Sequence, residues 1–109
     1  MRSLIVLAFL LFTPTSLDKV ESSDITVLQI NAHWNKHHDV NLNSLRGCKV
    51  QYGLLERQSE DLKNQIQYVP VVVVYKGNKA VRQWSADLSF KLDVDLNEIQ
   101  QVIDIYLFE

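Results

Sequence analysis

Three histidines, the only ones in the chain, lie close together at His33, His37 and His38, and Asp39 follows them directly. Imidazole is the commonest metal-binding side chain, and residues four positions apart, such as His33 and His37, share one face of a helix. We expect instead that His33 ends a strand and that a helix begins at His37, so that no single face holds both rings. Because the neighbouring His37 and His38 then point in divergent directions, a solvated loop is the favoured interpretation. Metal binding by this loop is the alternative, and no cofactor is expected.

Cys48 is the only cysteine, which excludes both an intrachain disulfide and a metal site made of cysteines alone. Free cysteines are among the most buried residue types and usually pack as small hydrophobes. The alternatives for Cys48 are a reactive thiol and an intermolecular disulfide. No Ser/His/Asp set, paired carboxylate site or glycine-rich phosphate loop can be assembled from the sequence. The sequence therefore predicts no catalytic residue and leans away from an enzyme.

The composition excludes several classes of protein. The chain has 109 residues, 47% hydrophobic and 22% charged, which is typical of a single soluble globular domain. The formal net charge is −2 and lysine and arginine form no cluster, so a nucleic-acid partner has no electrostatic basis.

The first residues have the pattern of a secretory signal. A short basic start precedes nine apolar residues at 4–12, and small or helix-stopping residues follow at 13–16. The apolar run is far shorter than the roughly 20 residues that a membrane-spanning helix needs. We expect a signal peptide at 1–16, a linker at 17–23 and one domain at 24–109. The protein is then exported, to a periplasm or outside the cell. If the run is instead a buried strand, the protein is cytoplasmic.

Hydrophobic periodicity after residue 23 predicts seven elements in the order strand, helix, strand, helix, strand, strand, helix. Three of them are helices with recognisable start signals. Asp39 precedes the first, Ser59 the second, and Asp95 with Glu98 forms a capping box for the third. The strands are expected at 24–31, 48–54, 71–75 and 80–84, and the helices at 40–46, 60–67 and from 96 to about 107.

One stretch of this order resembles the thioredoxin family. Residues 66–78, IQYVPVVVVYKGN, are similar to the second half of a thioredoxin, where a helix end is followed by a cis-proline, a hydrophobic strand and a Lys-Asn-Gly-type turn. Upstream, residues 32–38, AHWNKHH, lie where the family has a tryptophan followed by Cys-Gly-Pro-Cys. The resemblance covers about residues 24–107. It implies an α/β, thioredoxin-like fold with a central mixed sheet of about four strands flanked by helices.

Two departures from the family change what the resemblance implies. Asn35 and His38 stand where the two redox cysteines would be. Disulfide exchange needs a thiolate that attacks and a second thiol that resolves the mixed disulfide, and neither an amide nor an imidazole can do this. The helix after the loop must also be short, because only nine residues separate His38 from the next strand.

The resemblance still implies a surface that binds without chemistry. In the family the peptide bond before the proline that corresponds to Pro70 is cis, and the preceding residue offers its backbone to an extended peptide. We therefore expect a redox-inactive thioredoxin-like domain that binds a peptide or protein, of unknown identity, in a shallow groove. The alternatives are a single-cysteine redox protein that uses Cys48 and a histidine-loop metal-binding protein. The groove residues implied by the resemblance are Trp34, Asn35, Lys36, His37, His38, Val69 and Pro70.

Overall fold

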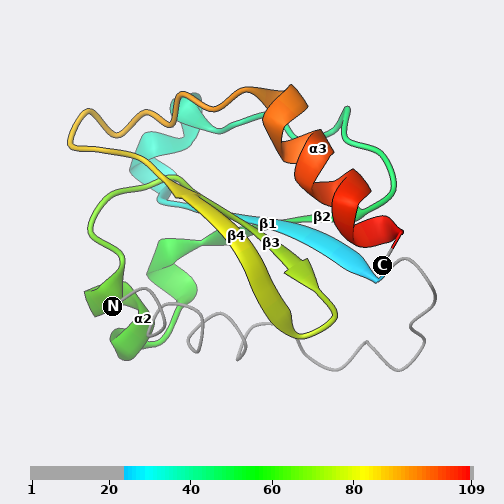
Figure 1. Cartoon of the computed structure of the whole chain (residues 1–109). Helices are drawn as coiled ribbons and strands as arrows, with labels where there is room; N and C mark the ends of the chain where they lie inside the picture. Colours follow the sequence, from blue (N-terminus) through cyan, green and yellow to red (C-terminus); the bar gives the residue numbers. More distant parts are fainter. Residues whose placement is uncertain (1–23, 109) are drawn as a thin grey trace.

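The computed structural model describes residues 24–108, which form a four-stranded mixed sheet with helices on both faces (Figure 1). The expected signal peptide and linker lie outside the described residues. The order of strands across the sheet is β2-β1-β3-β4. β1 runs parallel to β2, whereas β3 is antiparallel to both β1 and β4. The α/β class and the mixed sheet of four strands are thus confirmed. The strands are β1 (Ile25–Asn31), β2 (Lys49–Leu54), β3 (Val71–Lys76) and β4 (Lys79–Ser85).

The two central strands are apolar on both faces because each face is covered. The five residues 71–75 of β3 are all buried, as are most of those in β1. A strand buried on both sides reads as a continuous hydrophobic run, which is the pattern of both segments. The edge strands β2 and β4 are only partly buried.

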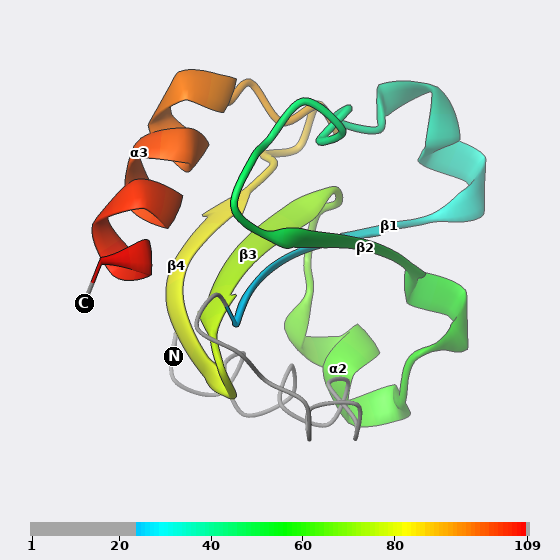
Figure 2. The ribbon, with the colours of Figure 1, turned by 90° about the vertical axis from the view of Figure 1, so that its right-hand side faces the viewer.

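The sheet separates two hydrophobic clusters, and alternate residues of β3 enter each of them. One cluster joins Val73 and Tyr75 to Leu62 of α2 (Glu60–Gln65). The other joins Val72 and Val74 to Ile99 and Ile103 of α3 (Leu96–Leu107). The two helices therefore lie on opposite faces of the sheet, as Figures 1 and 2 show.

The caps of α2 and α3 follow the sequence signals in part. Ser59 accepts a hydrogen bond from the Leu62 amide at 3.2 Å, as expected of an N-cap. α2 ends earlier than predicted, because the backbone is already extended at Ile66 on its way to Val69-Pro70, whose peptide bond is cis.

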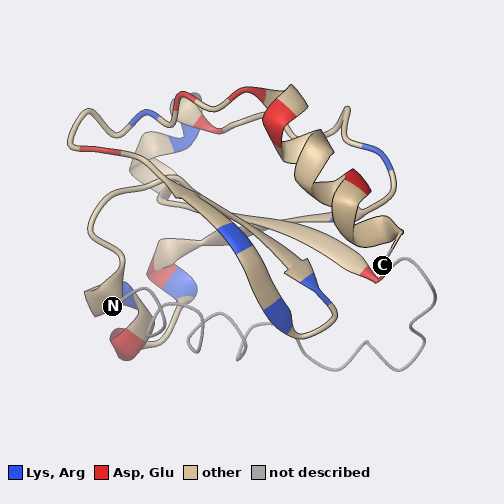
Figure 3. Cartoon of the chain, in the orientation of Figure 1, with Lys and Arg blue, Asp and Glu red and all other residues tan. Residues whose placement is uncertain are grey.

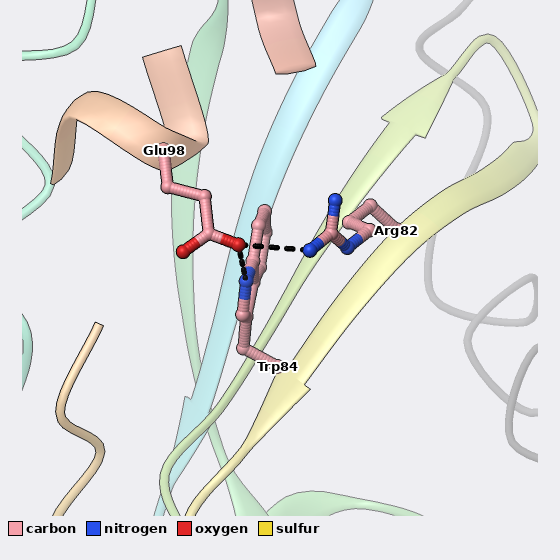
Figure 4. Close-up of polar contacts among 3 residues, drawn as sticks. All are labelled: Arg82, Trp84 and Glu98. Carbon is pink, nitrogen blue, oxygen red and sulfur yellow. Dashed lines mark hydrogen bonds and ion pairs between the residues drawn. The ribbon is translucent and has the colours of Figure 1, made fainter. Parts of the chain in front are cut away.

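The predicted capping box of α3 is only half formed. Asp95 accepts from the Asn97 amide at 2.9 Å, but the Glu98 carboxylate does not return to the Asp95 backbone. It accepts instead from Arg82 at 2.8 Å and from the Trp84 indole at 3.1 Å, both on β4 (Figure 4). Glu98 thus joins α3 to the edge of the sheet.

The predicted helix at 40–46 is wrong, because this segment is irregular. Gln29 of β1 takes both backbone groups of Val40, with its amide donating to the carbonyl and its oxygen accepting from the N–H, each at 2.8 Å. The Asn41 side chain accepts from the Asn43 amide in an Asx turn, which competes with helix formation. Leu42 and Leu45 of this segment are nevertheless buried.

Two short 3₁₀ helices, η2 (His33–His38) and η3 (Leu55–Arg57), follow the ends of β1 and β2. The expectation that His33 ends a strand and His37 begins a helix is wrong, since both belong to η2. Asp39 ends η2 rather than starting a helix, and its amide donates to the Lys36 carbonyl. Within residues 24–108 no helix is long and apolar enough to cross a membrane.

Candidate functional site

η2 directs its residues three ways, because a 3₁₀ helix has three residues per turn. Residues three apart therefore share a direction, although the helix is kinked at Asn35, where φ is −110° and ψ is 16°. The contacts of η2 and of Asp39, which ends it, fall into the corresponding sets. The sets are Asn35 and His38 on the inner side, Trp34 and His37 on the outer side, and His33, Lys36 and Asp39 on the side of a pocket.

The Asn35 side chain is 2% exposed and bridges three parts of the chain. Its Nδ2 lies 3.0 Å from Asn31 Oδ1 at the end of β1, 3.2 Å from the Val69 carbonyl and 3.0 Å from the Phe90 carbonyl. All three partners accept, so both hydrogens of the amide are used internally. Asn35, which the resemblance implies at the position of a first thiol, is therefore part of the internal hydrogen-bond network.

His38 is fixed from the same side. Its Nδ1 lies 2.9 Å from the Phe90 carbonyl and 3.1 Å from Asn35 Oδ1. Since both neighbours are acceptors, Nδ1 carries a hydrogen and donates it. Asn35 and His38 therefore both donate to the carbonyl of Phe90. We call this pair of hydrogen bonds the inner clasp of η2.

Phe90 belongs to the irregular 86–95 segment between β4 and α3, and the sequence analysis did not single it out. Its ring makes edge contacts with Trp34 at 5.1 Å and with Tyr68 at 5.6 Å between centroids. Its φ of +60° is in the left-handed region, which for a residue other than glycine costs roughly 1–3 kcal/mol. The ring contacts and the hydrogen bonds to its carbonyl offset this strain and hold Phe90 in this conformation.

The expected groove between the 34–38 loop and Val69-Pro70 is bridged by the chain itself. The Val69 carbonyl, which the resemblance offers to a peptide, accepts from Asn35, and Val69 is 1% exposed. The backbone of Phe90 lies beside this bridge, because its carbonyl accepts hydrogen bonds from Asn35 and His38. Of the seven predicted groove residues, only Trp34, Lys36 and His37 have exposed side chains.

Trp34 is the large side chain that η2 presents to solvent. It is 60% exposed, and the edge contact with Phe90 supports its ring. Leu88, in the same segment as Phe90, is 73% exposed. The His37 ring lies beside that of His38, with 4.1 Å between the centroids and 44° between the ring planes. The outer side of η2 and residue 88 therefore present apolar and aromatic surface at this end of the sheet.

A pocket of about 220 Å³ lies on the third side of η2, at the carboxyl ends of the parallel strands β1 and β2. Crevices at this position are the common ligand sites of α/β sheets. Asn31 donates to the carboxylate of Asp39 at 2.6 Å and so fixes one polar group of the wall. The lining residues are Gln29, Asn31, Ala32, His33, Lys36, Asp39, Tyr52, Gly53 and Leu54.

Glu56 of η3 connects this pocket wall to η2. Its carboxylate accepts from the His33 amide, with oxygen–nitrogen distances of 2.9 and 3.2 Å. Hydrogen bonds from its own backbone and from that of His33 hold the pKa of Glu56 below its usual range. The sequence does not predict this contact, because two residues 23 positions apart leave no periodic pattern.

Cys48 lies far from η2. It precedes Lys49, which pairs with Thr26 at the start of β1, whereas η2 follows Asn31 at the other end. From Thr26 to Asn31 the strand advances by five residues, or about 17 Å at ~3.4 Å per residue. The side chain is half-buried, and burial raises the pKa of the thiol. Cys48 therefore shares no site with the clasp or with Val69-Pro70.

The histidines do not converge. His38 is hydrogen-bonded to the Phe90 carbonyl, while His33 faces the pocket on another side of η2. Between residues 24 and 108, no three side chains of the types His, Cys, Asp and Glu are grouped so that they could hold a metal ion.

Comparison with known proteins does not place the chain in a family. No protein-family model matches it, and no curated protein is significantly similar to it. The arguments for a function therefore rest on its own residues.

Proposed function

We propose that this chain is a thioredoxin-like domain without thiol chemistry, which binds a protein or peptide through the outer side of η2. The observation that carries the proposal is the contrast within η2 itself. At the positions where the resemblance implies thiols, the side chains of Asn35 and His38 donate to acceptors within the chain. Trp34, which directly precedes Asn35 in the sequence, is instead 60% exposed.

The arrangement of the sheet supports the thioredoxin-like part of the proposal. A parallel β1–β2 pair followed by antiparallel β3 and β4 is compatible with the fold that the resemblance implies. One helix covers each face, and Pro70 immediately precedes β3. The irregular 40–46 segment takes the place of the short helix and still buries Leu42 against α3's side of the sheet.

The binding part of the proposal depends on the exposed aromatic surface. Tryptophan and tyrosine are enriched among the residues that dominate binding energy at protein interfaces, because they bury much apolar area at little entropic cost. Trp34 is held in place by Phe90, so its ring is already positioned before a partner arrives. Leu88 adds aliphatic surface from the segment that carries Phe90.

No observation favours redox chemistry at Cys48. A thiol with a raised pKa is protonated at neutral pH, and the protonated form does not attack a disulfide. We expect native Cys48 to react with iodoacetamide at least tenfold more slowly than the denatured chain at pH 7.5. The native rate should rise as the pH increases, because the thiolate fraction grows. Native labelling as fast as in the denatured chain would favour the redox alternative.

The test of binding is selection of random peptides displayed on phage against the immobilised full chain. Selected peptides are then synthesised and titrated against the wild type, Trp34→Ala and Ile105→Ala, the last of which removes an equally exposed apolar side chain from α3. We expect Trp34→Ala to weaken binding at least tenfold, or about 1.4 kcal/mol, and Ile105→Ala to change it little. Peptides that bind all three proteins equally, or a failure to select any, would contradict the proposal.

A further inference from the structure

The two edges of the sheet are protected to different degrees. At β4, the pairing with β3 contains an irregularity between Val74 and Tyr75, and Lys79 and Arg82 lie on the strand. Figure 3 shows this basic character along β4. Bulges and charged side chains are the devices by which proteins keep an edge strand from pairing with another chain.

Side-chain contacts also tie β4 to α3. Arg82 forms an ion pair with Glu98 at 2.8 Å, and its guanidinium lies 5.0 Å from the centroid of the Trp84 ring. Trp84 donates to the same carboxylate oxygen (Figure 4). Side chains of β4 are thus held by contacts within the chain.

The β2 edge has fewer of these devices, because its one charged residue, Lys49, lies at the first position of the strand. Its register with β1 continues without a shift from Lys49 to Leu54, and residues 50–54 carry no charge. The strand contains no proline. β2 is the outermost strand on its side, and in Figure 2 no described strand lies beyond it. An edge strand with a regular register and no charge beyond its first residue is a template for another strand.

Tyr52 occupies the middle of this edge and is 50% exposed. Its hydroxyl accepts from the Leu42 amide at 3.1 Å, so the ring has a fixed position on the α3 side of the sheet. Aromatic residues directly opposite each other stabilise neighbouring antiparallel strands by roughly 0.2–1 kcal/mol.

We propose that β2 pairs antiparallel with β2 of a second copy of this chain, centred on Tyr52, and that the two sheets become one of eight strands. A two-fold axis perpendicular to the sheet makes the interface closed and self-complementary. It places Tyr52 opposite its symmetry mate. The surface lies apart from Trp34, so the proposal does not depend on the proposed function.

Charge favours a second copy as the occupant. In the centred register, the two Lys49 residues are about 20 Å apart at ~3.4 Å per residue, well beyond the Debye length of about 8 Å at physiological salt. Lys49 then lies opposite the uncharged Leu55. The corresponding pairing of β4 about its central Arg82 places two arginines opposite each other. Of the two edges, β2 is therefore the one that self-pairs without repulsion.

Disulfide trapping in the full chain tests the register. Cys48→Ser removes the natural thiol, and Tyr52→Cys adds one at the two-fold axis; Gln83→Cys on β4, in the same Cys48→Ser background, is the matched control. Directly opposite residues in antiparallel strands have Cα atoms about 4.5–5.5 Å apart, within disulfide range. We expect the Tyr52→Cys protein to form covalent dimers at least tenfold faster than the control. Equal rates would overturn the proposal.

A second measurement avoids changing Tyr52 and separates the possible occupants. Sedimentation velocity of the full chain should show a concentration-dependent dimer, weak because six strand residues form less than a standard interface. Gln51→Lys should raise its dissociation constant at least tenfold, and Gln83→Lys on β4 should leave it unchanged. A monomer at all concentrations would overturn the proposal. So would association that Gln51→Lys does not weaken. Protection from hydrogen exchange, in the monomer, of those β2 amides that do not bond to β1 would also overturn it, because it would indicate an occupant within the chain.

Discussion

The inner and outer sides of η2 differ in what their side chains contact, although they alternate along only six residues. On the inner side, Asn35 and His38 bind the Phe90 carbonyl, 55 and 52 residues away. On the outer side, Trp34 faces solvent and touches the same Phe90 only through the edge of a ring. One short helix therefore both ties a distant segment to the sheet and presents a surface, and the two roles should respond differently to substitution.

The largest effect is expected from Asn35→Ala. The substitution leaves the buried Val69 carbonyl without a partner, which costs roughly 1–3 kcal/mol, and removes one of the two hydrogen bonds to the Phe90 carbonyl, which keeps that from His38. We expect the free energy of unfolding to fall by about 3 kcal/mol, measured by urea denaturation with tryptophan fluorescence. The outward-facing His37→Ala is the control and should stay within about 0.5 kcal/mol. Equal stabilities of the two variants would remove the distinction between the sides.

A smaller effect is expected at Phe90, where ring contacts and backbone strain oppose each other. Phe90→Ala removes the contacts with Trp34 and Tyr68 but keeps a side chain at φ +60°. We expect a loss of about 2 kcal/mol. Phe90→Gly removes the same contacts and also the strain, since glycine adopts positive φ at no steric cost. It should therefore be more stable than Phe90→Ala by about 1 kcal/mol in the same denaturation experiment. The reverse order would show that the clasp does not hold Phe90 in this conformation.

The smallest effect on stability is expected from Trp34→Ala. Its ring is mostly exposed, and the aromatic pair with Phe90 contributes roughly 0.5–1.5 kcal/mol. We expect the free energy of unfolding to fall by about 1 kcal/mol, while binding of selected peptides weakens at least tenfold. A loss as large as that of Asn35→Ala would mean that Trp34 supports the fold rather than a surface.

The elements that the sequence predicted correctly are those that depend on local pattern. Alternation at 48–54 and the apolar run at 71–75 produced β2 and β3 within one residue at each end. Ser59 and Asp95 cap their helices as predicted, because an N-cap bond spans only two or three residues. The helix at 40–46 failed because a side chain outside the segment, that of Gln29, holds the Val40 backbone.

The candidate site was harder to predict for the same reason. The loop with Asn35 and His38 stood out by its resemblance to thioredoxins, but the residue that fills the adjoining groove, Phe90, did not. Its contacts cross more than fifty residues, and nothing in the 86–95 segment has helical or strand periodicity. The pocket likewise combines the ends of two strands with η2, a combination that follows from the sheet order rather than from any one stretch of sequence.

The central claim, a site that binds without thiol chemistry, is tested most directly by insulin reduction driven by dithiothreitol. The full chain has an amide, Asn35, and a hydrogen-bonded imidazole, His38, at the positions where the resemblance to thioredoxins implies thiols, and its one cysteine lies at the other end of β2. We expect insulin to precipitate no faster with this protein than with an albumin blank. Turnover comparable to that of a thioredoxin, abolished by Cys48→Ser, would contradict the account and assign the chemistry to Cys48.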